Sequence, residues 1–426
     1  MFFNIKNHIV VLSYSGKHVL YDLKKDLFFE ISRDCMNTLK LFKDSPVDTK
    51  NVQVNPIIIK DLLDNNIIYK SDKYIPHDIF DETLIKIKTE KSFKKKPKKA
   101  TIYITKQCPL NCTHCAVSAW KKGPMELSDD ERMKTVEQLS LNKFDLFQIS
   151  GWEPFLRKKL ILNILKKFWN KFKNIVINTN ALLIDDEILE YLEKYKVIVY
   201  VSIYWSNSSL YKSITGFDFF EKADKWIRML CKKDIDVRAS IPMISNYIKN
   251  INEINDYVHS FGITRIAYMW LIPAWRAKDN MKTLITEKRS EYLPKMYKYC
   301  WESEIMFDNV NKTIIDIPCH SYSVRVSIDN QWSVYPCEFL PIYLWNIRDQ
   351  SLSQIIKSSN AHYCYHDLDV NSITLCNKCV YKYACKAICP SMTYSATWNY
   401  LNPPPTCSIA TKRFYKKLKN NNLFWE

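Results

Sequence analysis

The stretch Tyr103–Ser118, "YITKQCPLNCTHCAVS", decides the fold of this chain. It places Cys108, Cys112 and Cys115 in a C-x-x-x-C-x-x-C spacing, directly after a strand-like apolar segment at Thr101–Thr105. Protein 4Fe–4S clusters are usually held by four cysteine thiolates. Three cysteines on one short loop therefore suit a cluster in which one iron keeps an open position for a ligand. Folds of the α/β class place ligand sites just past the carboxyl ends of strands, as here.

A second motif, Ser150-Gly151-Trp152-Glu153-Pro154, follows another strand-like run, Phe144–Ile149. Together with the cysteine loop it resembles the radical S-adenosylmethionine (SAM) superfamily, whose Gly-Gly-Glu-Pro motif it matches except that Trp152 replaces the second glycine. A zinc loop, buried thiols or an ordinary strand-to-helix turn are the alternatives to these two assignments.

The resemblance implies a site and a reaction. The amino and carboxylate groups of SAM chelate the open iron, and one electron cleaves SAM to methionine and a 5′-deoxyadenosyl radical. Gly151, Trp152, Glu153 and Pro154 are expected to orient SAM, since in the family the strand edge and the glutamate of this motif hold the SAM amino group. Further contacts with SAM are expected from residues at the strand ends: Asn180 in "INTNA", where Ala181 replaces a family glycine, Ser202, Arg238, and His114, which is expected to pack near adenine rather than to bind metal. The alternative for these residues is a strand-end turn or a polar group in the core.

Composition limits the class of protein. The chain has 426 residues, of which 47% are hydrophobic, and it has 14 cysteines and a net charge of +17. No apolar stretch is long enough to span a bilayer, and no signal peptide is recognised, so a cytoplasmic protein is expected. Cysteines in that compartment favour metal or redox chemistry over disulfides. The positive charge favours acidic partners, although the basic run Ile85–Ala100 is interpreted as a solvated linker.

The chain is expected to divide into four parts: residues 1–75, a basic linker at 76–100, a central domain at 101–299 and a C-terminal domain at 300–426. In the first part, three strand-like runs and two helical segments, capped by Ser32 and begun by Pro56, resemble the winged-helix-like leader-recognition element of peptide-modifying enzymes. There a leader peptide adds as a further strand at the sheet edge. A small structural cap is the alternative.

The central part alternates strands with amphipathic helices. Its strand-like runs are Thr101–Thr105, Phe144–Ile149, Asn174–Thr179, Val197–Ile203, Asp236–Pro242 and Arg265–Trp270. Six βα units predict an α/β fold with a parallel sheet covered by helices. This matches the partial (β/α)6 barrel of the radical SAM family, which leaves one side open for a large substrate.

The C-terminal part contains a second field of cysteines, with a C-x-x-C-x5-C-x3-C block. It resembles the SPASM extension, which holds two auxiliary 4Fe–4S clusters, while a pair of zinc sites is the alternative. The resemblance implies an outer cluster bound by Cys376, Cys379, Cys385 and Cys407, and an inner cluster bound by Cys319, Cys337 and Cys389. Cys300 or an open iron completes the inner cluster. Trp332 occupies a position where the family usually has glycine.

These features favour a radical SAM–SPASM maturase that modifies a ribosomally made precursor peptide and receives electrons from a flavodoxin or ferredoxin. A cross-link at an aromatic side chain is the favoured product, and no catalytic acid or base is identified. The alternatives are a sulfatase-type or other protein-maturing radical SAM oxidase, which does not need residues 1–75, and an RNA-modifying enzyme, for which no stacking aromatics interleaved with basic residues are recognised. Neither a nucleic-acid partner nor a membrane partner is expected.

Overall fold

The structure, a computed structural model, describes most of the chain: residues 1–14, 16–22, 27–50, 54–80, 97–116, 119, 126–269, 271–272, 274–285, 325–340, 342–380, 382, 387, 389–404 and 407. These residues form two compact units. The N-terminal unit combines Met1–Lys94 with Asp369–Ile388, and the barrel unit contains Lys95–Asn309, Cys319–Leu368 and Cys389–Glu426. The predicted boundaries at residues 75, 100 and 299 stay predictions. No helix in the described part of the chain is long and apolar enough to cross a membrane.

The N-terminal unit contains a three-stranded antiparallel sheet, β2 (Ile9–Tyr14), β3 (Lys17–Asp22) and β4 (Leu27–Ile31), in that order. Two helices follow, and each begins as the sequence predicts. The Ser32 side chain accepts from the backbone N–H of Cys35 at the start of α1 (Arg33–Asp44), and Pro56 opens α2 (Pro56–Asp64). One strand pair was not predicted: β1 (Phe2–Ile5) pairs antiparallel with β5 (Ile68–Ser71).

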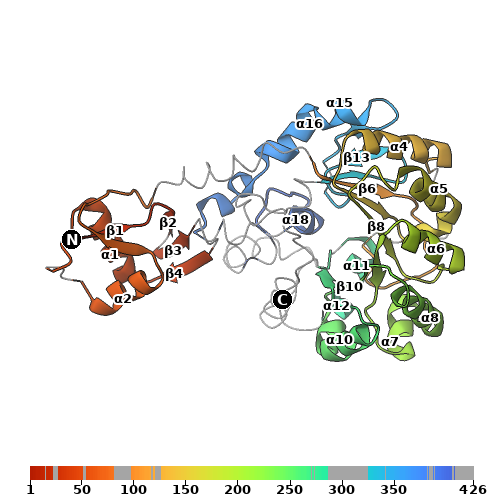
Figure 1. The fold of residues 1–426 in the computed structure, drawn as a ribbon, viewed down its shortest axis with the longest axis horizontal. Coiled ribbons are helices and arrows are strands. Elements are labelled where there is room, and N and C mark those ends of the chain that lie inside the picture. The colour runs from red at the N-terminus through yellow and green to blue at the C-terminus, as the bar shows by residue number, and fades with distance from the viewer. Residues whose placement is uncertain are drawn as a thin grey trace. The chain divides into compact units, whose positions relative to one another are not determined.

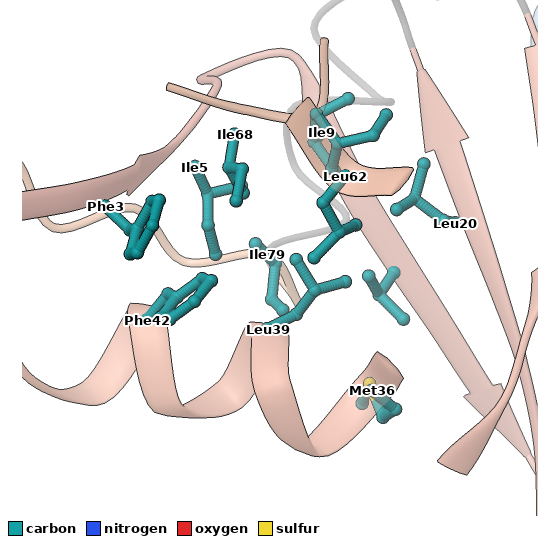
Figure 2. Packing of buried hydrophobic residues seen from close by; sticks show 12 residues of the cluster. Phe3, Ile5, Ile9, Leu20, Met36, Leu39, Phe42, Leu62, Ile68 and Ile79 are labelled. Carbon is teal, nitrogen blue, oxygen red and sulfur yellow. The ribbon is translucent and has the colours of Figure 1, made fainter. Parts of the chain in front are cut away.

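Each face of the β2–β3–β4 sheet is buried. On one face, Ile9, Val11 and Leu20 join side chains of both helices in a core that also includes Phe3 and Phe42, whose rings stack at 5.1 Å (Figure 2). The alternate residues point to the other face. They pack against the segment that carries two of the predicted cluster cysteines, in a core of Val10, Leu12, Val19, Tyr21, Val370, Ile373, Cys376, Val380 and Ala387.

The barrel unit is built on a nine-stranded sheet in the order β11-β10-β9-β8-β7-β6-β12-β13-β14. The first six of these strands are parallel and follow the chain order, which confirms the predicted βα pattern. Their bounds are β6 (Lys99–Tyr103), β7 (Leu146–Ser150), β8 (Asn174–Thr179), β9 (Ile198–Ser202), β10 (Val237–Pro242) and β11 (Ile266–Met269).

Helices connect these strands along the outer side of the sheet (Figure 1). They are α4 (Asp129–Leu141), η1 (Pro154–Arg157), α5 (Lys158–Phe168), α6 (Asp186–Lys194), α7 (Ser208–Thr215), α8 (Phe220–Cys231), α9 (Ser245–Lys249) and α10 (Ile251–Ser260), and α11 (Trp275–Asp279) and α12 (Met281–Leu284) follow β11. Helix α5 shows why they form: Leu160, Ile161, Ile164, Leu165 and Phe168 recur at helical spacing and are all buried.

The C-terminal part extends the same sheet. β12 (Arg325–Ile328) lies parallel to β6, and β13 (Ser333–Tyr335) and β14 (Trp345–Asn346) continue antiparallel. The turn before β13 has Trp332 where the family usually has glycine. It needs no glycine, because the Asp329 carboxylate accepts from the backbone N–H groups of Gln331, Trp332 and Ser333, each at 2.9 Å. The remaining elements are α15 (Leu352–Ile356), α16 (Ser359–His362), η2 (Tyr363–Asp367), η3 (Val370–Ser372), η4 (Cys376–Lys378) and α18 (Pro390–Thr397).

Candidate active site

The three cysteines of the first motif lie on the loop after β6. All three are partly buried and form no disulfide, and the N–H of Cys115 donates to the carbonyl of Cys112 at 3.2 Å. Burial raises the pKa of Cys112 to about 11, and burial also raises the pKa of Cys108, with a further increase from the other two thiols. Thiols with raised pKa values become thiolates only beside a positive centre. The irons of a bound cluster supply such a centre.

Among the described residues, no three Cys, His, Asp or Glu side chains are grouped as ligands of a metal ion. Thiolates that bind different irons of a cluster lie farther apart than the ligands of a single ion. Loop chemistry and spacing, rather than preset ligand geometry, therefore identify Cys108, Cys112 and Cys115 as a fit for a cluster.

Gly151 brings the second motif against the cysteine loop. Its φ is +148°, and a Cβ atom at this position would lie 3.1 Å from the Thr105 carbonyl oxygen. This close approach lets the Trp152 N–H donate to Thr105 O at 3.3 Å and the Glu153 N–H donate to Gln107 O at 3.1 Å. Two backbone hydrogen bonds therefore hold the motif against Thr105 and Gln107, directly before Cys108 begins the cysteine run.

Glu153 is fully buried and joins the ends of β7 and β8. Its carboxylate accepts from the Thr179 hydroxyl at 2.9 and 3.0 Å and from the backbone N–H groups of Asn180 at 2.8 Å and Phe155 at 3.2 Å. Burial raises its pKa to about 7, and these hydrogen bonds oppose the shift. The structure thus gives Glu153 a positioning role within the protein, and its contact with SAM stays a prediction.

The strand-end residues predicted to contact SAM divide into two groups. Asn180 lies beside the cysteine loop, because its side-chain amide donates to Cys108 Sγ at 3.6 Å, and Ala181 adopts the φ of +65° that a glycine would favour. Ser202 ends β9 and is partly buried. The guanidinium of Arg238 instead donates to Asp236 at 2.8 and 3.0 Å and to the Tyr200 hydroxyl at 3.2 Å. The roles of these residues toward SAM stay predictions.

His114 is part of the cysteine loop, and its ring packs in an aromatic cluster with Tyr204 and Tyr247. Its ring meets Tyr204 edge-on at 4.7 Å, and its Nδ1 is 3.4 Å from the Tyr247 hydroxyl. Burial lowers the pKa of His114 to about 4, with a further decrease from the charge of Arg276. The imidazole is therefore neutral at physiological pH.

Sequence reasoning missed a set of hydrogen bonds that hold the cysteine loop. Arg276 donates to the carbonyls of Cys112 at 3.1 Å and Ala119 at 3.2 Å, and the Ala277 N–H donates to Cys115 O at 3.1 Å. Asn280 donates to Thr113 O at 3.3 Å. We call Arg276, Ala277 and Asn280 the α11 clamp. The local sequence after β11 does not predict the α11 clamp, because the residues that it contacts lie more than 150 residues earlier in the chain.

A partly buried carboxylate supports the loop from its other end. Glu126 accepts from the Thr105 hydroxyl at 3.0 Å, the Lys106 N–H at 2.8 Å and the Asn330 amide at 3.1 Å. It also pairs with the fully buried Arg132 at 3.2 Å. Glu126 therefore fixes the chain between β6 and the first cysteine, although no motif in the sequence singles it out.

The auxiliary cysteines are only partly described. Cys300, Cys319 and Cys385 lie outside the described residues. Cys376 and Cys379 form a tight turn, in which the Cys379 N–H donates to Cys376 O at 2.9 Å, and they belong to the N-terminal unit. The other three belong to the barrel unit: Cys337, whose Sγ lies 3.8 Å from the Ser391 hydroxyl, Cys389 at the start of α18, and Cys407.

Comparisons with known proteins bear on this geometry. The model of the radical SAM superfamily matches residues 102–258. The chain is 24% identical over 334 residues to an AdoMet-dependent heme synthase of Methanosarcina barkeri, which covers 71% of this chain and 94% of that protein. It is 26% identical over 279 residues to the antilisterial bacteriocin subtilosin biosynthesis protein AlbA of Bacillus subtilis, which covers 62% of this chain and 61% of AlbA.

Among solved structures, the crystal structure of Streptococcus suis SuiB bound to precursor peptide SuiA has a similar fold. The TM-score is 0.58 at 16% sequence identity, and the match covers 95% of this chain and 100% of SuiB. The shared fold therefore includes residues on both sides of the region that the family model matches.

Proposed function

We propose that this chain, whose residues 102–258 form a radical SAM domain, modifies a ribosomally made precursor peptide with a SAM-derived radical. The observation that carries the proposal is the β2–β3–β4 sheet of the N-terminal unit. It has two buried faces and ends in an edge strand, which is a form suited to binding an extended peptide.

The packing of this sheet limits where a peptide can bind. One face is covered by α1 and α2, and the other by the segment Asp369–Ile388. On the β2 side, the Val11 N–H donates to the Ile79 carbonyl at 2.6 Å. β4 is the terminal strand on the other side. We therefore place the leader peptide along β4 as an added strand, where main-chain hydrogen bonds supply affinity.

Within the radical SAM domain, Cys108, Cys112 and Cys115 would hold the SAM-binding cluster. When bound, the cluster and SAM together supply, after one-electron reduction, a carbon radical that removes a hydrogen atom from the substrate. The turn at Gly151–Pro154 with Asn180 and Ser202, His114 and Arg238 would surround SAM. Glu153 holds the β7 and β8 turns in fixed positions, so that SAM meets preorganised groups.

We further propose two auxiliary 4Fe–4S clusters. Cys376, Cys379, Cys385 and Cys407 would bind the outer one, and Cys319, Cys337 and Cys389, with Cys300 or an open iron, the inner one. An auxiliary cluster that accepts the electron left on the substrate fits a cross-link at an aromatic side chain. The electrons for SAM cleavage would come from a flavodoxin or ferredoxin in the cytoplasm.

A second candidate is a SAM-dependent step of haem synthesis, which the alignment over 94% of the M. barkeri enzyme favours. The sulfatase-type oxidase is a third candidate. Neither of these gives the N-terminal unit a substrate to bind, and both can be separated from the peptide maturase by assaying the substrate directly.

The test is co-expression of the chain with each short open reading frame encoded beside its gene, followed by mass spectrometry of the peptides. A cross-link removes two hydrogens from one of them, and a variant with Cys108, Cys112 and Cys115 changed to alanine leaves it unmodified. The same variant should lose about four of about twelve irons per chain. No mass change in any peptide, with turnover of a haem precursor instead, would refute the proposal.

Leader recognition is tested on the peptide rather than by truncating the enzyme. Removing residues 1–75 would also expose Val370, Ile373 and Cys376, which the sheet covers. We expect the core peptide alone to be modified slowly, and the leader supplied as a separate peptide to restore the rate. Equal rates with and without the leader would contradict leader binding while leaving the radical chemistry intact.

A further inference from the structure

The Tyr204 hydroxyl lies 3.3 Å from Cys112 Sγ, within hydrogen-bond distance for sulfur. Tyr204 follows β9 and is 4% exposed. Its ring is held on two sides, by the His114 ring edge at 4.7 Å and by the Tyr247 ring stacked at 5.6 Å. The hydroxyl is therefore fixed on the sulfur by packing and does not depend on a flexible side chain.

The direction of this hydrogen bond follows from the chemistry of the pair. A cysteine that binds iron has lost its proton, so that its sulfur only accepts hydrogen bonds. A tyrosine hydroxyl keeps its proton at neutral pH, so Tyr204 is the donor of this pair. The neighbouring Tyr247 hydroxyl is close to His114 Nδ1, at 3.4 Å, and Arg276 donates to the Cys112 carbonyl. Within the described part of the chain, Tyr204 is thus the side chain that donates a hydrogen bond to Cys112 Sγ.

We propose that Tyr204 is a positioning residue that sets the reduction potential of the cluster bound at Cys108, Cys112 and Cys115. This inference rests on the proposed function. A reduced cluster carries one more negative charge, which its sulfurs share. A donor aimed at one of them stabilises the reduced form more than the oxidised form and raises the potential. The same bond fixes the Cys112 rotamer, while the α11 clamp holds the backbone beneath it.

The test compares Tyr204→Phe with a matched control, Tyr211→Phe. Each change removes one buried phenol hydroxyl, but the Tyr211 hydroxyl has no hydrogen-bond partner within the described residues. Tyr211 is 1% exposed and packs edge-on against Trp205 at 5.0 Å. The full-length, iron-loaded protein is titrated with dithionite under EPR detection, and the SAM-binding cluster is recognised by the change of its signal when SAM is added.

We expect the potential of this cluster to shift to a more negative value in Tyr204→Phe and to stay at the wild-type value in Tyr211→Phe. An unchanged potential in Tyr204→Phe, or an equal shift in both variants, would overturn the inference. If the Tyr204→Phe protein loses iron, a second variant with fluorotyrosine at position 204 is tested instead. Its more acidic hydroxyl donates more strongly and should shift the potential of the cluster to a more positive value. If the EPR signal of the wild-type protein did not change when SAM is added, that result would instead contradict the proposed function.

Discussion

Gly151 gives the sharpest test of the site, because an added methyl group would meet main-chain atoms. In Gly151→Ala the Cβ would lie 3.1 Å from Thr105 O and 3.3 Å from Thr105 N. Neither atom can rotate away, and overpacking of this kind costs about 1–3 kcal/mol. The φ of +148° adds strain of order 1–3 kcal/mol for a residue with a side chain. We expect a total loss of about 2–6 kcal/mol of stability in the barrel unit.

The displaced turn should also lose its function. Relief of the clash breaks the hydrogen bonds from Trp152 N–H and Glu153 N–H to the cysteine loop. We expect the affinity for SAM, measured by isothermal titration on iron-loaded protein, to fall at least about 10-fold. Urea unfolding of the same samples measures the loss of stability.

Gly262→Ala is the matched control. Its φ is +81° and, among the described residues other than its chain neighbours, no atom lies within 4 Å of the added Cβ, so only backbone strain of about 1–2 kcal/mol is expected, with SAM affinity unchanged. If both variants lost the same stability and bound SAM equally well, the close approach of Gly151 to Thr105 would have no role in the site.

Three other predictions concern Glu153, Leu12 and Arg276. Because burial raises the pKa of Glu153 from 4.5 to about 7, the contribution of Glu153 to stability is largest below pH 4.5 and should fall by about 3 kcal/mol as the pH rises through 7. Urea midpoints at pH 5 and 8 should therefore differ less in Glu153→Gln than in the wild type. Leu12→Ala should lower the free energy of unfolding by about 2–5 kcal/mol and release auxiliary iron, since Leu12 packs in the core that contains Cys376. The control is Ile57→Ala: the Ile57 side chain is 69% exposed, so this change should alter the free energy of unfolding by less than about 0.5 kcal/mol. Arg276→Gln should speed iron loss to a chelator, as it removes hydrogen bonds worth about 1.5–3 kcal/mol each.

Local pattern was enough to predict the central fold. The range Asn174–Thr179 was predicted as a strand and is β8. β6 was predicted at Thr101–Thr105 but begins at Lys99, because Lys99 pairs with both Arg325 of β12 and Leu146 of β7. The strand β12 was missed for a related reason: four residues carry too little periodicity, and β12 is defined by pairing with a strand more than 200 residues away.

The site was predicted in the same uneven way. Gly151 and Ala181 could be recognised because a motif demands a special backbone at each position, and both have positive φ. Tyr204 left no such signal, since it lies beyond the end of β9, where strand alternation no longer indicates the direction of a side chain. Arg276 left none, because it acts through main-chain carbonyls, which any sequence can supply. Glu126 left none, because its partners range from Thr105 to Asn330 along the chain and form no local motif.

The sequence by itself determined the chemistry of this protein: which thiols lie on one loop, which turn requires glycine and which segments alternate as strand and helix. These properties depend on neighbours within a few residues. The tertiary structure alone decided that Tyr204 meets Cys112, that α11 clamps the cysteine loop, and that Asp369–Ile388 covers the N-terminal sheet. Those contacts join residues about 90 to 360 positions apart, and burial of apolar surface brings them together without leaving a local pattern in the chain.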